Sequence, residues 1–340
     1  MLRIKTDKLN DLYSKINSFS PLYLPIKKAN AVNYGLWKED EVVSLSTLKT
    51  VKSPKDLFFP QTEDLMKFRS QGNSIAVTDV RDEKQPFVLM GVRACDFKAI
   101  DVLDRVFLAD PVDTYYQNRR QAGTVVTLAC SRPEESCFCK VFGIDATNPL
   151  GDVTTYLTEE YLYWQANTEK GQALTEKIKD LFEEADAKEV EDQKAKTKDI
   201  IEKLPFSNLD LSYFENTETN EIFRSPEWQA LSEGCLACGT CTFVCPTCQC
   251  FDIRDFKTDK GVIRYRCWDS CMYSDFTQMS HGNNRTTQMQ RYRQRFMHKL
   301  VYYPENNDGV YSCVGCGRCV NKCPQRLNIV KVIKTMGGKK

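Results

Sequence analysis

Cysteines are the residues of this sequence whose spacing indicates a specific chemistry. The chain has 340 residues and 16 cysteines, and eight of these cysteines form two runs of the pattern C-x2-C-x2-C-x3-C, each followed by proline. Three thiolates spaced in this way surround one 4Fe-4S cubane within a single loop, and the fourth reaches a neighbouring cubane. The runs are "CLACGTCTFVCP" at 235–246 and "CVGCGRCVNKCP" at 313–324.

The two runs predict two 4Fe-4S clusters that exchange one ligand. Because the fourth cysteine of each run serves the other cluster, each ligand set combines three residues of one run with the last residue of the other. The alternative is a pair of zinc knuckles, but these use two C-x2-C pairs and leave the other cysteines of each run unexplained. We expect one cluster on Cys235, Cys238, Cys241 and Cys323, and the other on Cys313, Cys316, Cys319 and Cys245.

Four cysteines in the first half of the chain form a second candidate group. Cys95 follows the apolar run "FVLMGV", and Cys130 ends the β-branched run "GTVVTLAC", so both are expected just after buried strands. Parallel strands end at a common sheet edge, where ligands bind, and Cys137 and Cys139 follow Cys130 within one loop. We expect a third 4Fe-4S cluster on these four residues. Buried reduced cysteines and a tetrahedral zinc site remain alternatives.

Four further cysteines, Cys248, Cys250, Cys267 and Cys271, lie between the two runs. They are numerous enough to bind one more ion or cluster, with His281 as a substitute ligand. Alternatively, they are thiols that pack around the neighbouring clusters and adjust their reduction potential through weak hydrogen bonds. The spacing does not decide between these two interpretations.

The elements that must position these cysteines indicate two domains. The strand at 87–92 precedes apolar residues at helical spacing in "DFKAIDVLDRVFLA", and residues 169–204 have the composition of one or two solvated helices. A further helix is expected from "RSPEWQALSEG", with Ser225 as N-cap and Pro226 at its first position. We therefore expect an α/β domain over 1–225, followed by a mainly helical, ferredoxin-like domain with two 4Fe-4S clusters over 226–340.

Charge and composition exclude several classes of function. The net charge is +1, from 47 basic and 46 acidic side chains, so the chain has no overall field for nucleic acid or for an anionic membrane. The first residues have no apolar segment with a cleavage site, and no apolar run is long enough to span a membrane. We expect a cytoplasmic protein, in which thiols stay reduced and bind metal rather than form disulfides.

Six segments in this order carry a resemblance to a known family: "GVRACDFKAIDVLDRVFL", "CFC", "CGTCTFVCPTCQC", "WDSC", "RYRQRFMHK" and "CVGCGRCVNKCP". With them, residues 87–335 resemble the A-type iron-sulfur subunit of anaerobic sulfite reductases and the related β subunit of cytoplasmic NiFe sulfhydrogenases. The resemblance implies an iron-sulfur protein that relays electrons between a flavoprotein subunit using NAD(P)H and a catalytic reductase or hydrogenase subunit.

The motifs that this sequence lacks agree with a relay. The sequence has no G-x-G-x-x-G after an expected strand, the pattern that binds a dinucleotide, and no pair of C-x2-C motifs near both termini of the kind that holds nickel and iron. Its partners are therefore expected to supply the catalysis. The competing hypothesis is a self-contained reductase, in which the cysteines beyond Cys245 build an open catalytic cluster.

Overall fold

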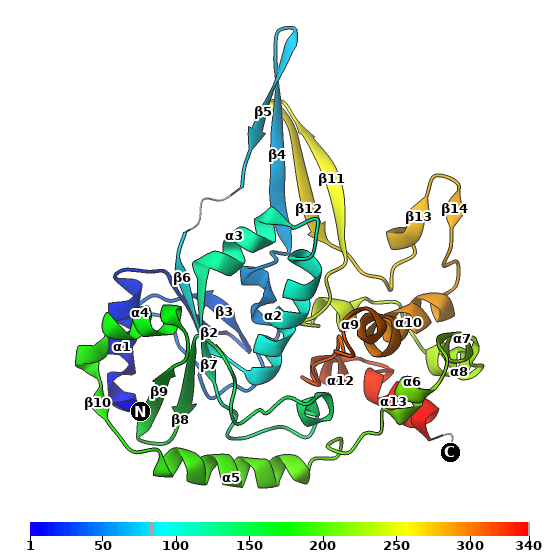
Figure 1. Ribbon diagram of the computed structural model, residues 1–340. Helices are drawn as coiled ribbons and strands as arrows, with labels where there is room; N and C mark the ends of the chain where they lie inside the picture. Colours follow the sequence, from blue (N-terminus) through cyan, green and yellow to red (C-terminus); the bar gives the residue numbers. More distant parts are fainter. Residues whose placement is uncertain (82–84, 339–340) are drawn as a thin grey trace.

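The centre of the first half of the molecule is a mixed eight-stranded sheet (Figure 1). The computed structural model describes residues 1–81 and 85–338. Strands β8, β7, β6 and β2 are parallel neighbours, and antiparallel strands extend the sheet on both sides, in the order β10-β1-β9-β8-β7-β6-β2-β3. The strands are β1 (Leu2–Lys5), β2 (Leu22–Lys28), β3 (Ala31–Leu36), β6 (Phe87–Val92), β7 (Gly123–Leu128), β8 (Val153–Leu157), β9 (Tyr161–Ala166) and β10 (Glu183–Glu184).

The two strands expected from the sequence, β6 and β7, are adjacent, parallel and almost wholly buried, which confirms both predictions. Neighbouring residues of β7 pack on opposite faces of the sheet, as a strand requires: Val125 joins one hydrophobic cluster, with Leu89 and Leu103, and Val126 joins another, with Ile16. The helices around this sheet are α1 (Leu9–Asn17), α2 (Ala94–Phe107), α3 (Thr114–Ala122), α4 (Glu169–Glu176) and α5 (Lys188–Glu202).

A second hydrophobic core holds the helices of the last third of the chain. Trp228, Tyr292 and Phe296 lie in it, together with Phe214 and Ile222. Residues before 225 therefore pack against the helices that follow, and the boundary near residue 225 stays a prediction. The helices are α6 (Ser212–Asn216), α7 (Thr219–Arg224), α8 (Glu227–Ser232), α9 (Thr240–Phe243), α10 (Gln288–Met297), α11 (Tyr303–Asn306), α12 (Arg318–Lys322) and α13 (Ile329–Gly337).

Local chemistry sets the start of some of these helices. Helix α10 begins with a capping box, in which the Thr287 hydroxyl accepts from Gln290 N and the Gln290 side chain accepts from Thr287 N. The expected start of α8 is wrong by one residue. Pro226 is its N-cap, and the Ser225 hydroxyl donates to the carboxylate of Glu227 rather than capping the helix.

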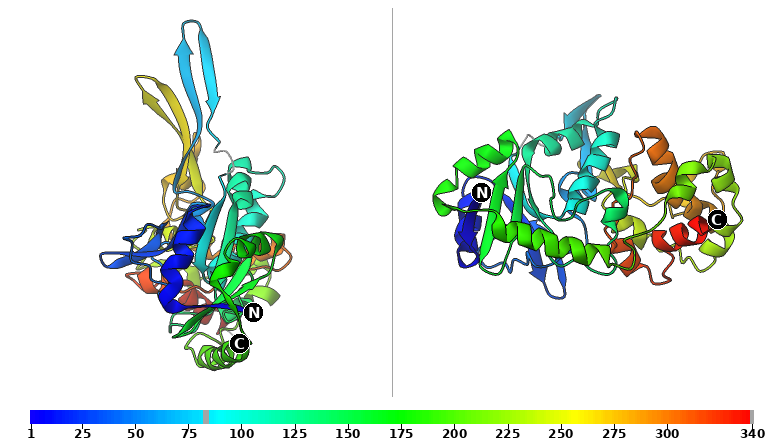
Figure 2. Two further views of the ribbon diagram at one scale, coloured as in Figure 1. Left: turned by 90° about the vertical axis from the view of Figure 1, so that its left-hand side faces the viewer. Right: turned by 60° about the horizontal axis from the view of Figure 1, so that its bottom comes forward.

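A four-stranded antiparallel sheet joins the two halves of the sequence. Its order is β11-β12-β4-β5, so the hairpin of residues 62–79 pairs with the hairpin of residues 251–268. Both hairpins extend away from the body of the molecule (Figures 1 and 2). The strands are β4 (Thr62–Gln71), β5 (Ser74–Asp79), β11 (Phe251–Thr258) and β12 (Gly261–Trp268).

These strands correct the expected fold class in part. The α/β character of the first half is confirmed, but residues 226–340 are not mainly helical throughout, because they contain β11, β12 and the short strands β13 (Gln278–Met279) and β14 (Gly282–Asn283). Buried Glu63 of β4 pairs with Arg266 of β12 and with Arg119 of α3, which ties this sheet to the first half. In the described part of the chain, no helix combines the length and the apolar composition needed to cross a membrane.

A buried ion pair connects the second cysteine run to the large sheet. Arg318, on α12 between two cysteines, donates to both carboxylate oxygens of Asp96 on α2 at 2.5 and 2.8 Å, and to Thr50 O at 3.0 Å. The side chains of Arg318 and Asp96 are 3% and 2% exposed. Two hydrogen bonds in parallel fix the direction of the guanidinium, and thereby the position of the loop that carries Cys316 and Cys319.

Replacing Asp96 by Ala is expected to destabilise the protein by about 3–5 kcal/mol, because it leaves the Arg318 charge buried without its partner. Asp101→Ala on the same helix is the matched control. Asp101 is 44% exposed and pairs with Lys98 at the surface, so its loss should change stability by about 0–1 kcal/mol. Anaerobic urea unfolding followed by circular dichroism measures both. Equal effects would contradict the role given to Asp96.

Candidate iron-sulfur site

Four thiols from both cysteine runs line the first cavity. Cys235 and Cys238 belong to the loop before α9, Cys241 lies on α9, and Cys323 follows α12. The loop turns sharply at Gly239, whose φ of 70° is in the left-handed region. This is the set that the crossed spacing predicts. The structure brings these four residues together, and their role as ligands stays a prediction.

The second cavity is lined by the other crossed set, Cys245, Cys313, Cys316 and Cys319. Its loop depends on two glycines with positive φ, Gly315 at 58° and Gly317 at 76°. A Cβ on Gly315 would lie 2.4 Å from the backbone of Phe138, and one on Gly317 would lie 2.2 Å from the carbonyl oxygen of Ser136. Only glycine therefore lets this loop approach the "CFC" segment so closely.

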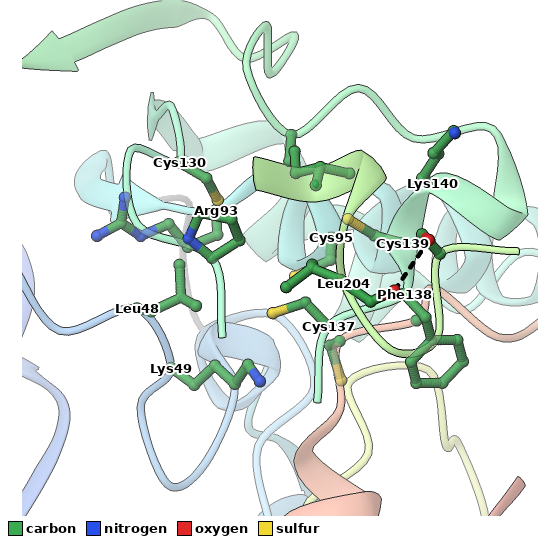
Figure 3. A pocket seen from close by; sticks show the side chains of 16 residues that line it. Leu48, Lys49, Arg93, Cys95, Cys130, Cys137, Phe138, Cys139, Lys140 and Leu204 are labelled. Carbon is green, nitrogen blue, oxygen red and sulfur yellow. Dashed lines mark hydrogen bonds between the residues drawn. The ribbon is translucent and has the colours of Figure 1, made fainter. Parts of the chain in front are cut away.

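The third cavity contains the four cysteines of the first half of the chain (Figure 3). Cys95 lies in the first turn of α2 just after β6, Cys130 follows β7, and Cys137 and Cys139 come from the next loop. The sulfur atoms of all four side chains face the same space (Figure 3). Parallel pairing of β6 and β7 brings the first two together, as the sequence indicates.

The three cavities share walls, so they form a row. Gly315, Cys316 and Phe138 line both the second and the third cavity, and Phe138 N donates to Gly315 O at 2.9 Å. Arg295 lines both the first and the second. The second cavity is therefore the middle one, and groups held in the three cavities would be neighbours.

Burial controls the protonation of the thiols that line these cavities. Burial raises the pKa of Cys130 to about 11, of Cys139 to about 12 and of Cys316 to about 11. Only the deprotonated thiolate is a metal ligand, so binding of metal must release these protons. The cavities are suited to a group whose positive charge replaces several protons at once.

Buried cations beside the cavities fit an anionic group. Arg295, 3% exposed, donates from Nε to Cys241 Sγ at 3.2 Å and from Nη2 to Cys241 O at 2.9 Å, while its buried Nη1 has no hydrogen-bond partner among the described residues. Buried Lys299 donates to Thr247 Oγ1 and Ser312 O beside the second cavity. Buried polar groups without partners are costly, so Nη1 indicates a missing acceptor. A cubane with four thiolates is such an acceptor.

Comparison with known proteins decides the family. Residues 234–327 match the family described as a 4Fe-4S dicluster domain. Sulfhydrogenase 2 subunit beta of Pyrococcus furiosus is 31% identical over 342 residues, which cover 98% of this chain and 97% of that protein. The chain belongs to the sulfhydrogenase β-subunit family. The resemblance of the sequence to this family is thereby confirmed, and the dicluster match coincides with the first two cavities.

The remaining cysteines of this family member do not assemble as one set of four. The Cys248 thiol is hydrogen-bonded to Cys245, and the Cys250 thiol is hydrogen-bonded to Cys271. Cys267 lies on β12 between buried Arg266 and buried Trp268, and strand alternation turns its side chain to the opposite face. His281 is exposed in the turn between β13 and β14. The structure therefore brings neither Cys267 nor His281 to this group.

The described residues contain no group of three or more His, Cys, Asp or Glu side chains arranged to hold a single metal ion. The buried cations were only partly accessible to sequence reasoning. Tyr292 and Phe296 have the spacing of an inward helix face, and Arg295 and Lys299 extend that face, but Lys55 lies in a segment without any motif.

Arg295→Met is expected to make the clusters predicted for the first two cavities harder to reduce. Two unit charges about 4 Å apart interact by ~4 kcal/mol at an effective dielectric constant of ~20. With ~59 mV per tenfold change for one electron, the shift should be on the order of 100 mV towards negative potential. A redox titration followed by electron paramagnetic resonance (EPR) measures it.

Arg293→Met is the matched control, because it removes the same charge from the same helix. Arg293 stacks on the Phe223 ring at 3.5 Å, donates to Phe223 O and lines none of the three cavities. Its loss should leave the potentials nearly unchanged. Equal shifts in both variants would show that Arg295 has no special position.

Proposed function

We propose that this chain is the iron-sulfur electron-transfer subunit of a hydrogenase-type complex, and that three 4Fe-4S clusters in a row carry the electrons. The observation that supports this most is the shared walls of three cavities, each with four thiols. Cubane clusters supply one-electron transfer. The chain's own part is to hold them, to exclude water from them and to balance their charge.

The proposed ligands follow the lining of the cavities. A cubane has four irons, so four thiolates occupy the external position of each iron and leave none for a substrate. This favours a relay over the alternative of a self-contained reductase with an open cluster. The proposed sets are Cys235, Cys238, Cys241 and Cys323 in the first cavity, Cys245, Cys313, Cys316 and Cys319 in the second, and Cys95, Cys130, Cys137 and Cys139 in the third.

The two ends of the row differ in their access to the surface. Beside the first cavity, Cys238 is exposed and Leu236 is 62% exposed. In the third cavity, Cys130, Cys137 and Cys139 are buried within the first half of the chain. The first cavity is therefore the end at which a partner can approach most closely.

The proposed partners are further subunits of the same complex. The Pyrococcus protein is named as the β subunit of a sulfhydrogenase, and we assign an equivalent place to this chain. A flavoprotein that uses NAD(P)H stands at one end of the relay, and the other end contacts the catalytic hydrogenase or reductase subunit. The complex is proposed to work in the cytoplasm, where thiols stay reduced.

The full chain, purified without oxygen, is expected to contain about twelve irons, four for each of three cubanes. Cys137→Ala should lower this to about eight, because it removes one ligand of the third cluster only. Cys267→Ala, which changes a cysteine outside the cavities, should leave the count unchanged. Iron and acid-labile sulfide assays measure the content. Zinc in place of iron, or reduction of sulfite by the isolated chain, would contradict the relay.

The exchange of ligands between the two runs can be tested with two neighbouring cysteines. Cys323→Ala should remove the first cluster, and Cys319→Ala, four residues earlier, should remove the second. The clusters have different surroundings, so EPR of the reduced protein should show different signals lost in the two variants. Loss of the same signal in both would mean that ligation is not crossed.

A further inference from the structure

Two cysteines outside the three cavities meet at the base of the β11–β12 hairpin. The strands pair from Phe251 opposite Trp268, and Asp269 N donates to Cys250 O at 2.9 Å, so the ladder continues one step beyond the strands. Cys271 follows this last step, and its thiol is hydrogen-bonded to the Cys250 thiol. Residues before and after the hairpin are thus held side by side by backbone pairing.

Positive charge surrounds this pair of thiols. Lys55 is 3% exposed, donates to the carbonyl oxygens of Cys245 and Cys248 at 3.2 and 2.8 Å, and lies 3.7 Å above the Trp268 ring. Lys299 is buried as well. Within the described residues, neither ammonium group has a carboxylate at ion-pair distance. Two buried cations without carboxylates favour a negative partner, and a thiolate is the anion available here.

The hydrogen bond from Cys271 also lowers the pKa of Cys250 to about 7, and the positive charges of Lys299 and Lys55 act in the same direction. Cys271 behaves oppositely, because its hydrogen bond to Cys250 and its burial raise its pKa. One thiolate beside one thiol is the arrangement in which a dithiol reacts most readily.

The pair also lies close to the second cavity. Cys248 is near Cys271, and its thiol is hydrogen-bonded to Cys245, which lines that cavity. A short path of sulfur atoms therefore leads from the pair to the proposed middle cluster.

We propose that Cys250 and Cys271 form a dithiol–disulfide couple that exchanges two electrons with the clusters. Oxidation joins the two sulfur atoms and releases the proton or protons they carry to solvent, which both partly exposed residues reach. The two electrons reduce two oxidised clusters, one electron each, and the reverse reaction opens the disulfide. The identity of the electron acceptors rests on the proposed function. The couple would link one-electron carriers to two-electron donors such as NAD(P)H.

Alkylation of the full chain at controlled potential tests the couple. The protein is equilibrated with redox mediators, treated with iodoacetamide, then denatured, reduced and treated with isotope-labelled iodoacetamide. Mass spectrometry gives the fraction of Cys250 and Cys271 in each form. Both residues should become protected together as the potential rises, with a tenfold change in ratio per ~30 mV, the slope of a two-electron couple.

Three variants make the test specific. Cys250→Ser should leave Cys271 open to alkylation at every potential, and Cys271→Ser should do the same for Cys250, with the iron content unchanged in both. Cys267→Ser, on the same hairpin but outside the pair, should leave the titration as in the wild type.

Three results would overturn the proposal: thiols that stay reactive at every potential, protection that persists in the reduced protein, or iron lost from either serine variant. The last two would mean that the pair binds metal. Iron content and EPR of the same samples keep the two hypotheses apart. A chain without clusters whose pair still titrates with the mediators would contradict the relay and leave the couple intact.

Discussion

Balance of charge around buried sulfur is the requirement on which the rest of this structure depends. A thiolate removed from water needs positive charge beside it, because an uncompensated buried charge destabilises the folded state strongly. Iron supplies most of that charge in a cubane, and the fold supplies the rest from Arg295 and Lys299. Both belong to the helical segment whose Tyr292 and Phe296 lie in the hydrophobic core, so the packing of apolar side chains sets where the positive charge stands.

Close backbone contact gives the second requirement. The loop of the second cavity rests on the segment 136–138 of the third, with no room for a side chain at Gly315 or Gly317. The buried pair of Arg318 and Asp96 holds the same junction from the side. Two cavities formed by distant parts of the sequence therefore have one common wall. Their separation is a property of the backbone and does not depend on flexible side chains.

Sequence reasoning reached the features that depend on local spacing. The cysteine runs specify loops around a cavity, and the strands before Cys95 and Cys130 end at one sheet edge, so the groupings of these residues were predictable. The face on which Cys267 lies was not, because it depends on Arg266 and Trp268 being buried by partners far away in sequence. Pairing of β4 with β12 was equally inaccessible, since neither strand's composition names the other. Ser225 failed as a cap because the helix starts one residue later than the Ser-Pro pattern indicates.

The sheet shared by both hairpins also determines when the molecule can be completed on the ribosome. Residue 62 pairs with residue 267, so the first hairpin leaves the ribosome long before its partner strand has been made. At about 5–20 residues per second, it must wait roughly 10–40 s with the free edge of β4 open to other chains. The first and second cavities need Cys323 and Cys313 as well, so iron can be enclosed there only once nearly the whole chain is available. Order of synthesis thus separates the third cavity, whose cysteines are all made by residue 139, from the two that close last.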